Sequence, residues 1–303
     1  QLSLKETKNG NKITSFILKN LQTQLTKIKF NHSASITIDS FYIMNYLSQQ
    51  YPKTLEVSKG INGSFAINSN EPYRISLNVS PIFAVVDVEW ISKISRFFEK
   101  KRAYIEVIDE SQTLHQIQSI IDSHKQLNLD LTINNSHIIV PYQEIEQEDQ
   151  PTFHLTFNSF TLKSTPSPKY DLNDINSLFD NFKLDVNQIE MDFCDRKMSN
   201  KFDIRANLDV AIVTSDEIES VKGIVDVSAL ELYSTTFQAL VLKELSLYLA
   251  DTVLLNAQAE QTGNTPENKV TINFDSFSVS LSYEEKPLFK LELLNDFRIN
   301  VSN

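Results

Sequence analysis

The sequence predicts a mainly β protein with a few helices, in which long antiparallel strands form one wide sheet. In residues 126–164, apolar and polar residues alternate on both sides of an acidic loop, as in Leu127-Asn128-Leu129-Asp130. Such period-two alternation is typical of strands with one apolar and one polar face. Several other alternating runs exceed the five or six residues of an ordinary strand.

A four-residue motif, apolar-polar-polar-apolar, interrupts the alternation repeatedly. It occurs at Leu18–Leu21, Ile38–Phe41, Phe157–Phe160, Leu242–Leu245, Phe274–Phe277 and Leu294–Phe297, with a looser copy at Val227–Leu230. A β-bulge would let the alternation restart on the same face, and a strand passing between two buried layers would explain the motif as well. In either case, one structural unit is used repeatedly.

The first third of the chain is predicted to be strands followed by a helix. The strands span 2–30 (two or three strands, with a turn at Asn9-Gly10), 33–46, 64–68, 73–79 and 82–86, with a connector over 51–62. The period then changes, because Trp90, Ile94 and Phe97 form one helical stripe in residues 89–102. A second helix is predicted over 111–124.

After the strand pair of residues 126–164, we expect a third helix over 171–182, capped near Asp171. The remaining strands are predicted over 183–193, 202–213, 222–233, 238–249, 252–259, 269–282 and 288–301. These elements suggest three approximate units, 1–110, 111–200 and 201–303. Because the chain starts at Gln1 and stops within a predicted strand, we expect a segment of a longer protein.

Composition excludes several classes of protein. The formal net charge is −11, which disfavours nucleic acid as a partner, since that affinity comes largely from neutralised phosphates. A single cysteine, Cys194, rules out a disulfide within the chain and favours a reducing compartment. Five glycines leave little material for loops that cradle phosphate, and no apolar run reaches the roughly 20 residues needed to span a bilayer.

The predicted sheet has more apolar surface than the predicted helices can cover. A sheet with one apolar face must bury it against another element. Three helices would cover roughly a third of that face, judged from the diameter of a helix. The face could therefore close on itself as a barrel or sandwich, or stay open and hold an apolar ligand.

Part of the sequence resembles the amino-terminal region of the vacuolar protein sorting thirteen family, the chorein-type bridge-like lipid-transfer proteins. The resembling segments are Leu127–Leu131, Ile138–Pro141 and Phe157–Leu162, with the strand-helix segment Ile75–Phe98 before them and the segment 170–191 after them. Asn158 stands where the family has a glycine, and the usual start of the chorein domain is absent.

The resemblance implies an elongated, open, gutter-like sheet of repeating β-groove units, whose apolar concave face carries phospholipid acyl chains between membranes. The implied partners are glycerophospholipids, membranes at the ends of the full-length protein and protein adaptors, at organelle contact sites in the cytoplasm, with no cofactor. The lining is expected from Leu129, Leu131, Leu155, Phe157, Phe160, Leu162, Val225, Val227, Leu230, Leu232, Leu242, Leu245, Leu247, Ile272, Phe274, Phe277, Val279, Leu281, Leu291 and Phe297. The alternative interpretation of these residues is an ordinary buried core.

No catalytic or metal-binding motif is recognisable, so we expect no enzyme activity. Of the five histidines, His115 and His124 share a predicted helix, but a spacing of nine residues places them about 13 Å apart along its axis. The helix that carries Trp90 could lie on a membrane or pack against the sheet. The alternative function is a closed β-sandwich that acts as a structural scaffold and binds proteins at its edges.

Overall fold

The computed structural model describes the strands and a few adjoining residues. The described residues are 2–5, 12–28, 31–47, 52–67, 73–79, 81–87, 90, 127–141, 152–165, 179–193, 196–211, 221–236, 238, 239, 243, 268–283 and 286–302. The predicted turn at Asn9-Gly10, the helix over 111–124, the acidic loop, Cys194 and the strand over 252–259 lie outside these residues.

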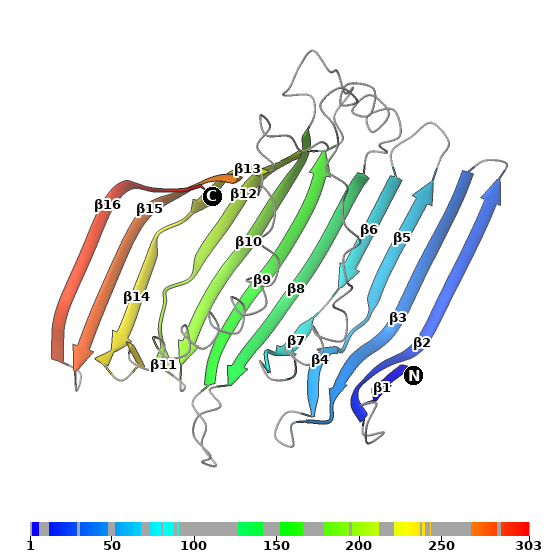
Figure 1. Cartoon of the computed structure of the whole chain (residues 1–303), viewed down its shortest axis with the longest axis horizontal. Coiled ribbons are helices and arrows are strands. Elements are labelled where there is room, and N and C mark those ends of the chain that lie inside the picture. The colour runs from blue at the N-terminus through cyan, green and yellow to red at the C-terminus, as the bar shows by residue number, and fades with distance from the viewer. Residues whose placement is uncertain are drawn as a thin grey trace, which may run out of the picture.

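All sixteen described strands belong to one large sheet (Figure 1). In the first half these are β1 (Leu2–Lys5), β2 (Lys12–Ile28), β3 (Asn31–Asn45), β4 (Lys53–Val57), β5 (Ile61–Ile67), β6 (Tyr73–Val79), β7 (Ile82–Val85) and β8 (Leu127–Pro141). In the second half they are β9 (Thr152–Thr165), β10 (Phe179–Phe193), β11 (Arg196–Lys197), β12 (Phe202–Ala211), β13 (Val221–Val227), β14 (Leu230–Thr235), β15 (Asn268–Tyr283) and β16 (Lys286–Ser302). The protein is mainly β, as the alternation predicted, and the sheet is not a closed barrel.

The sheet is mixed, so the prediction of a purely antiparallel sheet is wrong. Strands β6 and β7 both pair with β8 in parallel, and β13 and β14 both pair with β15 in parallel. Parallel neighbours need a connection of a dozen or more residues. Residues 86–126 and 236–267 supply such connections, and the alternation of a strand carries no information about the direction of its neighbour.

The interrupting motifs line up across the sheet as one line of polar residues, here named the crease. It comprises Lys19–Asn20 in β2, Asp39–Ser40 in β3, Asn134–Asn135 in β8, Asn158–Ser159 in β9, Asn187–Gln188 in β10 and Asp275–Ser276 in β15. The short strands break at the same line, because Val227 pairs with Phe274 at the end of β13 and Leu230 pairs with Phe277 at the start of β14.

Unusual backbone conformations among the described residues concentrate on the crease. The residues with positive φ are Asn20 (52°), Gly60 (108°), Asn135 (48°) and Gln188 (54°). Positive φ is uncommon for residues other than glycine. Crease side chains also bond one another across strands, as in the 2.7 Å hydrogen bond that Asn20 Nδ2 donates to Asp39 Oδ2.

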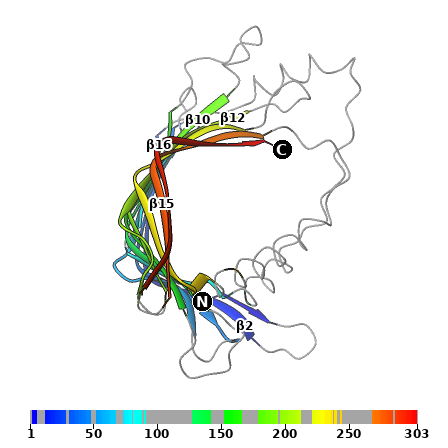
Figure 2. The same cartoon turned by 90° about the vertical axis from the view of Figure 1, so that its left-hand side faces the viewer.

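The crease lets the alternation restart on the same face, which decides between the two explanations of the motif. Val186 and Met191 lie on opposite sides of the crease in β10, and both pack against Ile189, Phe202 and Val227 in one cluster. Between β10 and β12 the register shifts, as in a β-bulge. Figure 2 shows the sheet end-on as a curved band, with β15 and β16 turning through a corner part-way along.

Four predicted elements are corrected. The connector predicted over 51–62 contains the strand β4, and the strand predicted over 222–233 is two strands, β13 and β14. The helix predicted over 171–182 is wrong at its end, because Phe179–Phe182 belong to β10 and pair with β12. The strand predicted over 238–249 is wrong at its start, because Gln238 and Ala239 are helical. Thr235 and Gln238 form a capping box there: Gln238 N donates to Thr235 Oγ1 (3.2 Å) and Thr235 N donates to Gln238 Oε1 (2.8 Å).

Candidate functional site

One face of the sheet carries an uninterrupted row of apolar residues. The apolar row consists of Leu21, Ile38, Ile61, Val79, Ile133, Phe160, Val186, Ile204, Val227 and Phe274, each paired in register with the next. Directly opposed residues point to the same face of a sheet. Ten strands, from β2 to β15, therefore present one continuous apolar line beside the crease.

The neighbouring row on the opposite face is entirely polar. The polar row consists of Gln22, Thr37, Asn62, Asn78, Thr132, Thr161, Asp185, Arg205, Asp226, Asn273 and Arg298. Its members bond along the row: Asn273 Nδ2 donates to Asp226 Oδ1 (2.8 Å), and Arg298 Nε donates to Asn273 Oδ1 (3.0 Å). The two rows together make the sheet amphipathic across its width.

The structure brings most of the lining residues chosen from the sequence to the apolar face. Leu155, Phe157, Val225, Val227, Leu230, Ile272 and Phe274 belong to one cluster with the buried Ile189 and Phe202. The others extend this face by strand pairing, through the pairs Leu131–Leu162, Leu230–Phe277, Leu232–Val279 and Val279–Leu291. Phe160 lies in the apolar row, Leu129 pairs with Ile75, and Leu281 pairs with Phe289.

Four lining residues chosen from the sequence are not placed. Leu242, Leu245 and Leu247 lie outside the described residues, as does the side chain of Phe297. Conversely, the sequence reasoning missed the contributions of β10 and β12, namely Leu184, Val186, Ile189, Phe202 and Ile204. The signal was present, because Val186-Asn187-Gln188-Ile189 is a further copy of the interrupting motif.

Much of the apolar face is not deeply buried. Leu131, Leu155, Phe160, Ile272 and Phe274 are all half-buried. Towards the first edge, Leu21 and Leu25 in β2 are 54% and 81% exposed. Single exposed apolar residues are common on proteins, but a contiguous apolar patch marks a binding surface.

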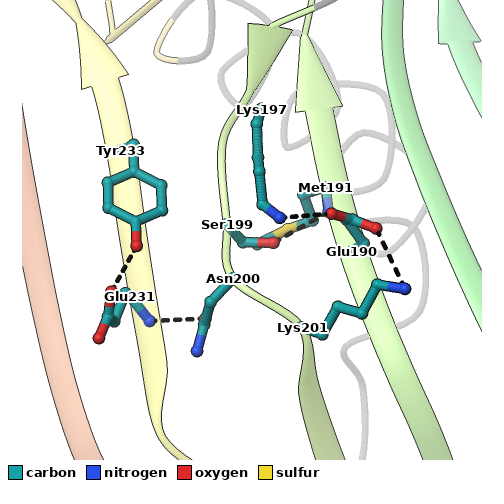
Figure 3. A network of polar contacts seen from close by, with 8 residues as sticks. All are labelled: Glu190, Met191, Lys197, Ser199, Asn200, Lys201, Glu231 and Tyr233. Atoms are coloured by element: carbon teal, nitrogen blue, oxygen red, sulfur yellow. Dashed lines mark hydrogen bonds and ion pairs between the residues drawn. The ribbon is translucent and has the colours of Figure 1, made fainter.

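Hydrogen bonds hold β14 beside the segment that joins β11 and β12 (Figure 3). Asn200 exchanges two hydrogen bonds with the Glu231 backbone, because Asn200 N donates to Glu231 O (3.1 Å) and Glu231 N donates to Asn200 Oδ1 (2.9 Å). Tyr233 N donates to Met198 O (2.7 Å). These hydrogen bonds join residues 198–200, which precede β12, to β14. The segment between β11 and β12 therefore links β14 to the rest of the sheet.

Charges in the same region pair with one another. Glu190 forms ion pairs with Lys197 (2.7 Å) and Lys201 (3.8 Å). A hydrogen bond to Glu231 raises the pKa of the Tyr233 phenol, with a smaller contribution from burial. Because the two lysines are exposed, although Glu190 is partly buried, such pairs contribute little stability.

Two histidines form a hydrogen-bonded chain on β8 and β9. His137 Nε2 lies 3.1 Å from His154 Nδ1, and His154 Nε2 lies 2.8 Å from Thr152 Oγ1. The ring of Phe83 meets His137 edge-on, with centroids 5.5 Å apart. Burial, and then the nearby His154, lower the pKa of His137, while Asp192 acts in the opposite direction.

No protein-family model matches this chain, and no curated protein resembles it significantly. In the part of the chain that the structure describes, no group of three or more His, Cys, Asp or Glu side chains could hold a metal ion. No helix among the described residues is long and apolar enough to cross a membrane. The amphipathic sheet is therefore the feature from which a function can be argued.

Proposed function

We propose that this chain is part of a bridge-like lipid-transfer protein of the vacuolar protein sorting thirteen type. In this proposal the sheet forms a gutter, and its apolar face lines the inside of the curve in Figure 2. Phospholipid acyl chains lie on that face while their head groups stay in water. The single observation that carries the proposal is the apolar row, which crosses ten strands without a polar member.

The dimensions of the row suit acyl chains. Neighbouring strands lie about 4.8 Å apart, so ten strands extend over roughly 45 Å. Each CH₂ group removed from water contributes about 0.8 kcal/mol. A row without polar members offers similar contacts at each strand, so a lipid can move along it without meeting a deep energy minimum. Apolar contacts are also non-directional, so we expect weak selectivity among phospholipids.

The remaining parts of the proposal follow from this role. Lipid movement needs no bond-making chemistry, so the proposed protein is not an enzyme and uses no cofactor. Its partners would be glycerophospholipids, the two membranes at its ends and protein adaptors, and its place would be a contact site between organelles. The alternative, a closed β-sandwich scaffold, requires a second sheet facing the first, whereas all described strands belong to one sheet.

A matched pair of variants tests the proposal. Phe160 and Thr161 are adjacent in β9 and belong to the apolar and polar rows respectively. We expect Phe160→Asp to reduce transfer of fluorescent phospholipid between vesicles by about tenfold, because a buried charge opposes acyl chains. Thr161→Asp should leave transfer within about twofold, since that position lies on the polar face of the sheet.

Circular dichroism establishes that both variants fold before transfer is measured. If the two variants slow transfer equally, the apolar face is not the path of the lipid. If the unmodified chain extracts no lipid from donor vesicles, the proposal fails as a whole.

A further inference from the structure

A separate depression lies on the polar side of β2, β3 and β4. Its volume is about 550 Å³, and its lining includes Lys19, Ser40, Tyr42, Met44 and Lys53. Sites for small molecules commonly have volumes of about 300–1,000 Å³. Tyr42 directly follows Phe41, which pairs with the apolar Leu18 and Val57, so the depression and the apolar face are on opposite sides of the sheet.

Two lysines from different strands converge on one aromatic ring in this depression. Lys19 Nζ lies 5.3 Å from the centroid of the Tyr42 ring, and Lys53 Nζ lies 5.4 Å from it. Strands β2 and β4 flank β3, so the two ammonium groups approach Tyr42 from neighbouring strands. Attraction between a cation and an aromatic face helps to hold each lysine there.

The lining is locally cationic although the chain is acidic. Lys53 forms an ion pair with Glu56 at 2.9 Å, and Glu56 is the one carboxylate among the described residues of the lining. Lys19 makes no ion pair within the described part of the chain. Two ammonium groups against one carboxylate leave a net positive charge, in a protein whose formal net charge is −11.

We propose that this depression binds a phosphorylated polyol. A phosphate monoester carries nearly two negative charges near neutral pH, which suits two lysines better than a carboxylate does. Lysine binds phosphate as a point charge and needs no fixed angle. The volume exceeds that of phosphate alone, and the hydroxyls of Ser40 and Ser58 offer partners for a polyol, while Met44 offers an apolar surface.

The ligand can come from two sources that share this chemistry: the head group of a phosphorylated lipid, or a soluble polyol phosphate. The site does not depend on the proposed lipid path, because it lies on the opposite side of the sheet. Acyl-chain loading and phosphate binding therefore fail or succeed separately when both are measured on the same preparation.

The test uses the whole chain, with inositol 1-phosphate as the soluble probe and calorimetry as the measurement. The variant is Lys19→Gln combined with Lys53→Gln, and the control is Lys163→Gln. Lys163 is an exposed lysine of β9 that pairs with Asp130 at 3.5 Å, away from the depression. We expect the double variant to bind the probe at least about tenfold more weakly, because charge-assisted hydrogen bonds are lost, and the control to bind normally.

Vesicles of phosphatidylcholine, with and without phosphatidylinositol 4-phosphate, distinguish the two sources. Binding that needs the phosphorylated lipid and is weakened in the double variant identifies a lipid head group. Binding of inositol 1-phosphate without vesicle binding identifies a soluble ligand. The proposal is overturned if the unmodified chain binds neither probe, or if Lys163→Gln weakens binding as much as the double variant does.

Discussion

Two regions of the sheet have the same arrangement of strands. Comparing them shows which features of the crease are common to both. In the first, β6 and β7 lie parallel to β8, which pairs antiparallel with β9. In the second, β13 and β14 lie parallel to β15, which pairs antiparallel with β16. The first region lies inside the sheet and the second ends at its edge (Figure 1).

The two regions build the crease differently. In β8 and β9 the register is the same on both sides of the crease, and Asn135 takes a positive φ of 48°. In β15 and β16 the register shifts between Phe274 and Ser276, and neither strand has a residue with positive φ. The pair of polar residues at the crease is therefore the constant feature, whereas the backbone conformation at the crease varies.

Burial differs between the strands that join the two regions and the outer edge of the second region, and this difference gives the largest expected effect. Phe202 in β12 belongs to the cluster between the two regions and is 7% exposed, whereas Phe289 in β16 is 55% exposed. We expect Phe202→Ala to lower the free energy of unfolding by about 3–4 kcal/mol, through lost burial and a cavity. Phe289→Ala should cost less than about 1 kcal/mol. Denaturant unfolding measures both, and equal costs would contradict the burial described here.

The next largest loss of stability is expected from replacing Gly60, a glycine at the crease. Gly60 has a φ of 108°, and a Cβ placed there would lie 2.9 Å from the carbonyl oxygen of Ile38. We expect Gly60→Ala to lower the free energy of unfolding by about 1–3 kcal/mol. Alanine adopts this positive φ poorly, and its Cβ would lie too close to the Ile38 carbonyl oxygen. The control is Gly63→Ala, whose Cβ would meet the movable Leu77 Cδ1 at 3.1 Å. Thermal unfolding should show the larger loss for Gly60→Ala.

Variants of Asn135 test whether the two regions differ in the backbone conformation of the crease. Asn135→Ala should cost about 1 kcal/mol, since alanine tolerates positive φ less well than asparagine. Asn135→Gly should cost less than Asn135→Ala, because glycine adopts this conformation readily. In the second region Asp275→Ala should change stability by less than about 0.5 kcal/mol. If Asp275→Ala lowers the free energy of unfolding more than Asn135→Ala does, positive φ at Asn135 is not what distinguishes the first region from the second.

The lowered pKa of His137 should make the first region sensitive to acid. Because the pKa of folded His137 is lowered, its contribution to stability is complete above the unfolded pKa of about 6.5 and is lost as the pH falls below it. We expect His137→Asn to make the decline of stability from about pH 7 to pH 5 shallower. His32→Asn, at an exposed position of β3, is the control and should leave the decline unchanged.

The sequence was informative where a pattern lies within one strand. Alternation predicted the strands and the apolar face, and the repeated motif predicted the crease residues, such as Asn158 and Ser159. Properties that depend on pairing were not predictable: the parallel neighbours of β8 and β15, the meeting of His137 with His154, and the depression around Tyr42. The capping box at Thr235 was visible in the sequence, but the apolar alternation after it favoured a strand.

Native mass spectrometry of the purified chain tests the central claim most directly, because it counts the molecules that remain bound without covalent bonds. We expect phospholipids of several head-group classes to remain bound, and Phe160→Asp to carry fewer of them than Thr161→Asp. A chain that is free of lipid, prepared under conditions that preserve its fold, would contradict the claim that the apolar face holds acyl chains.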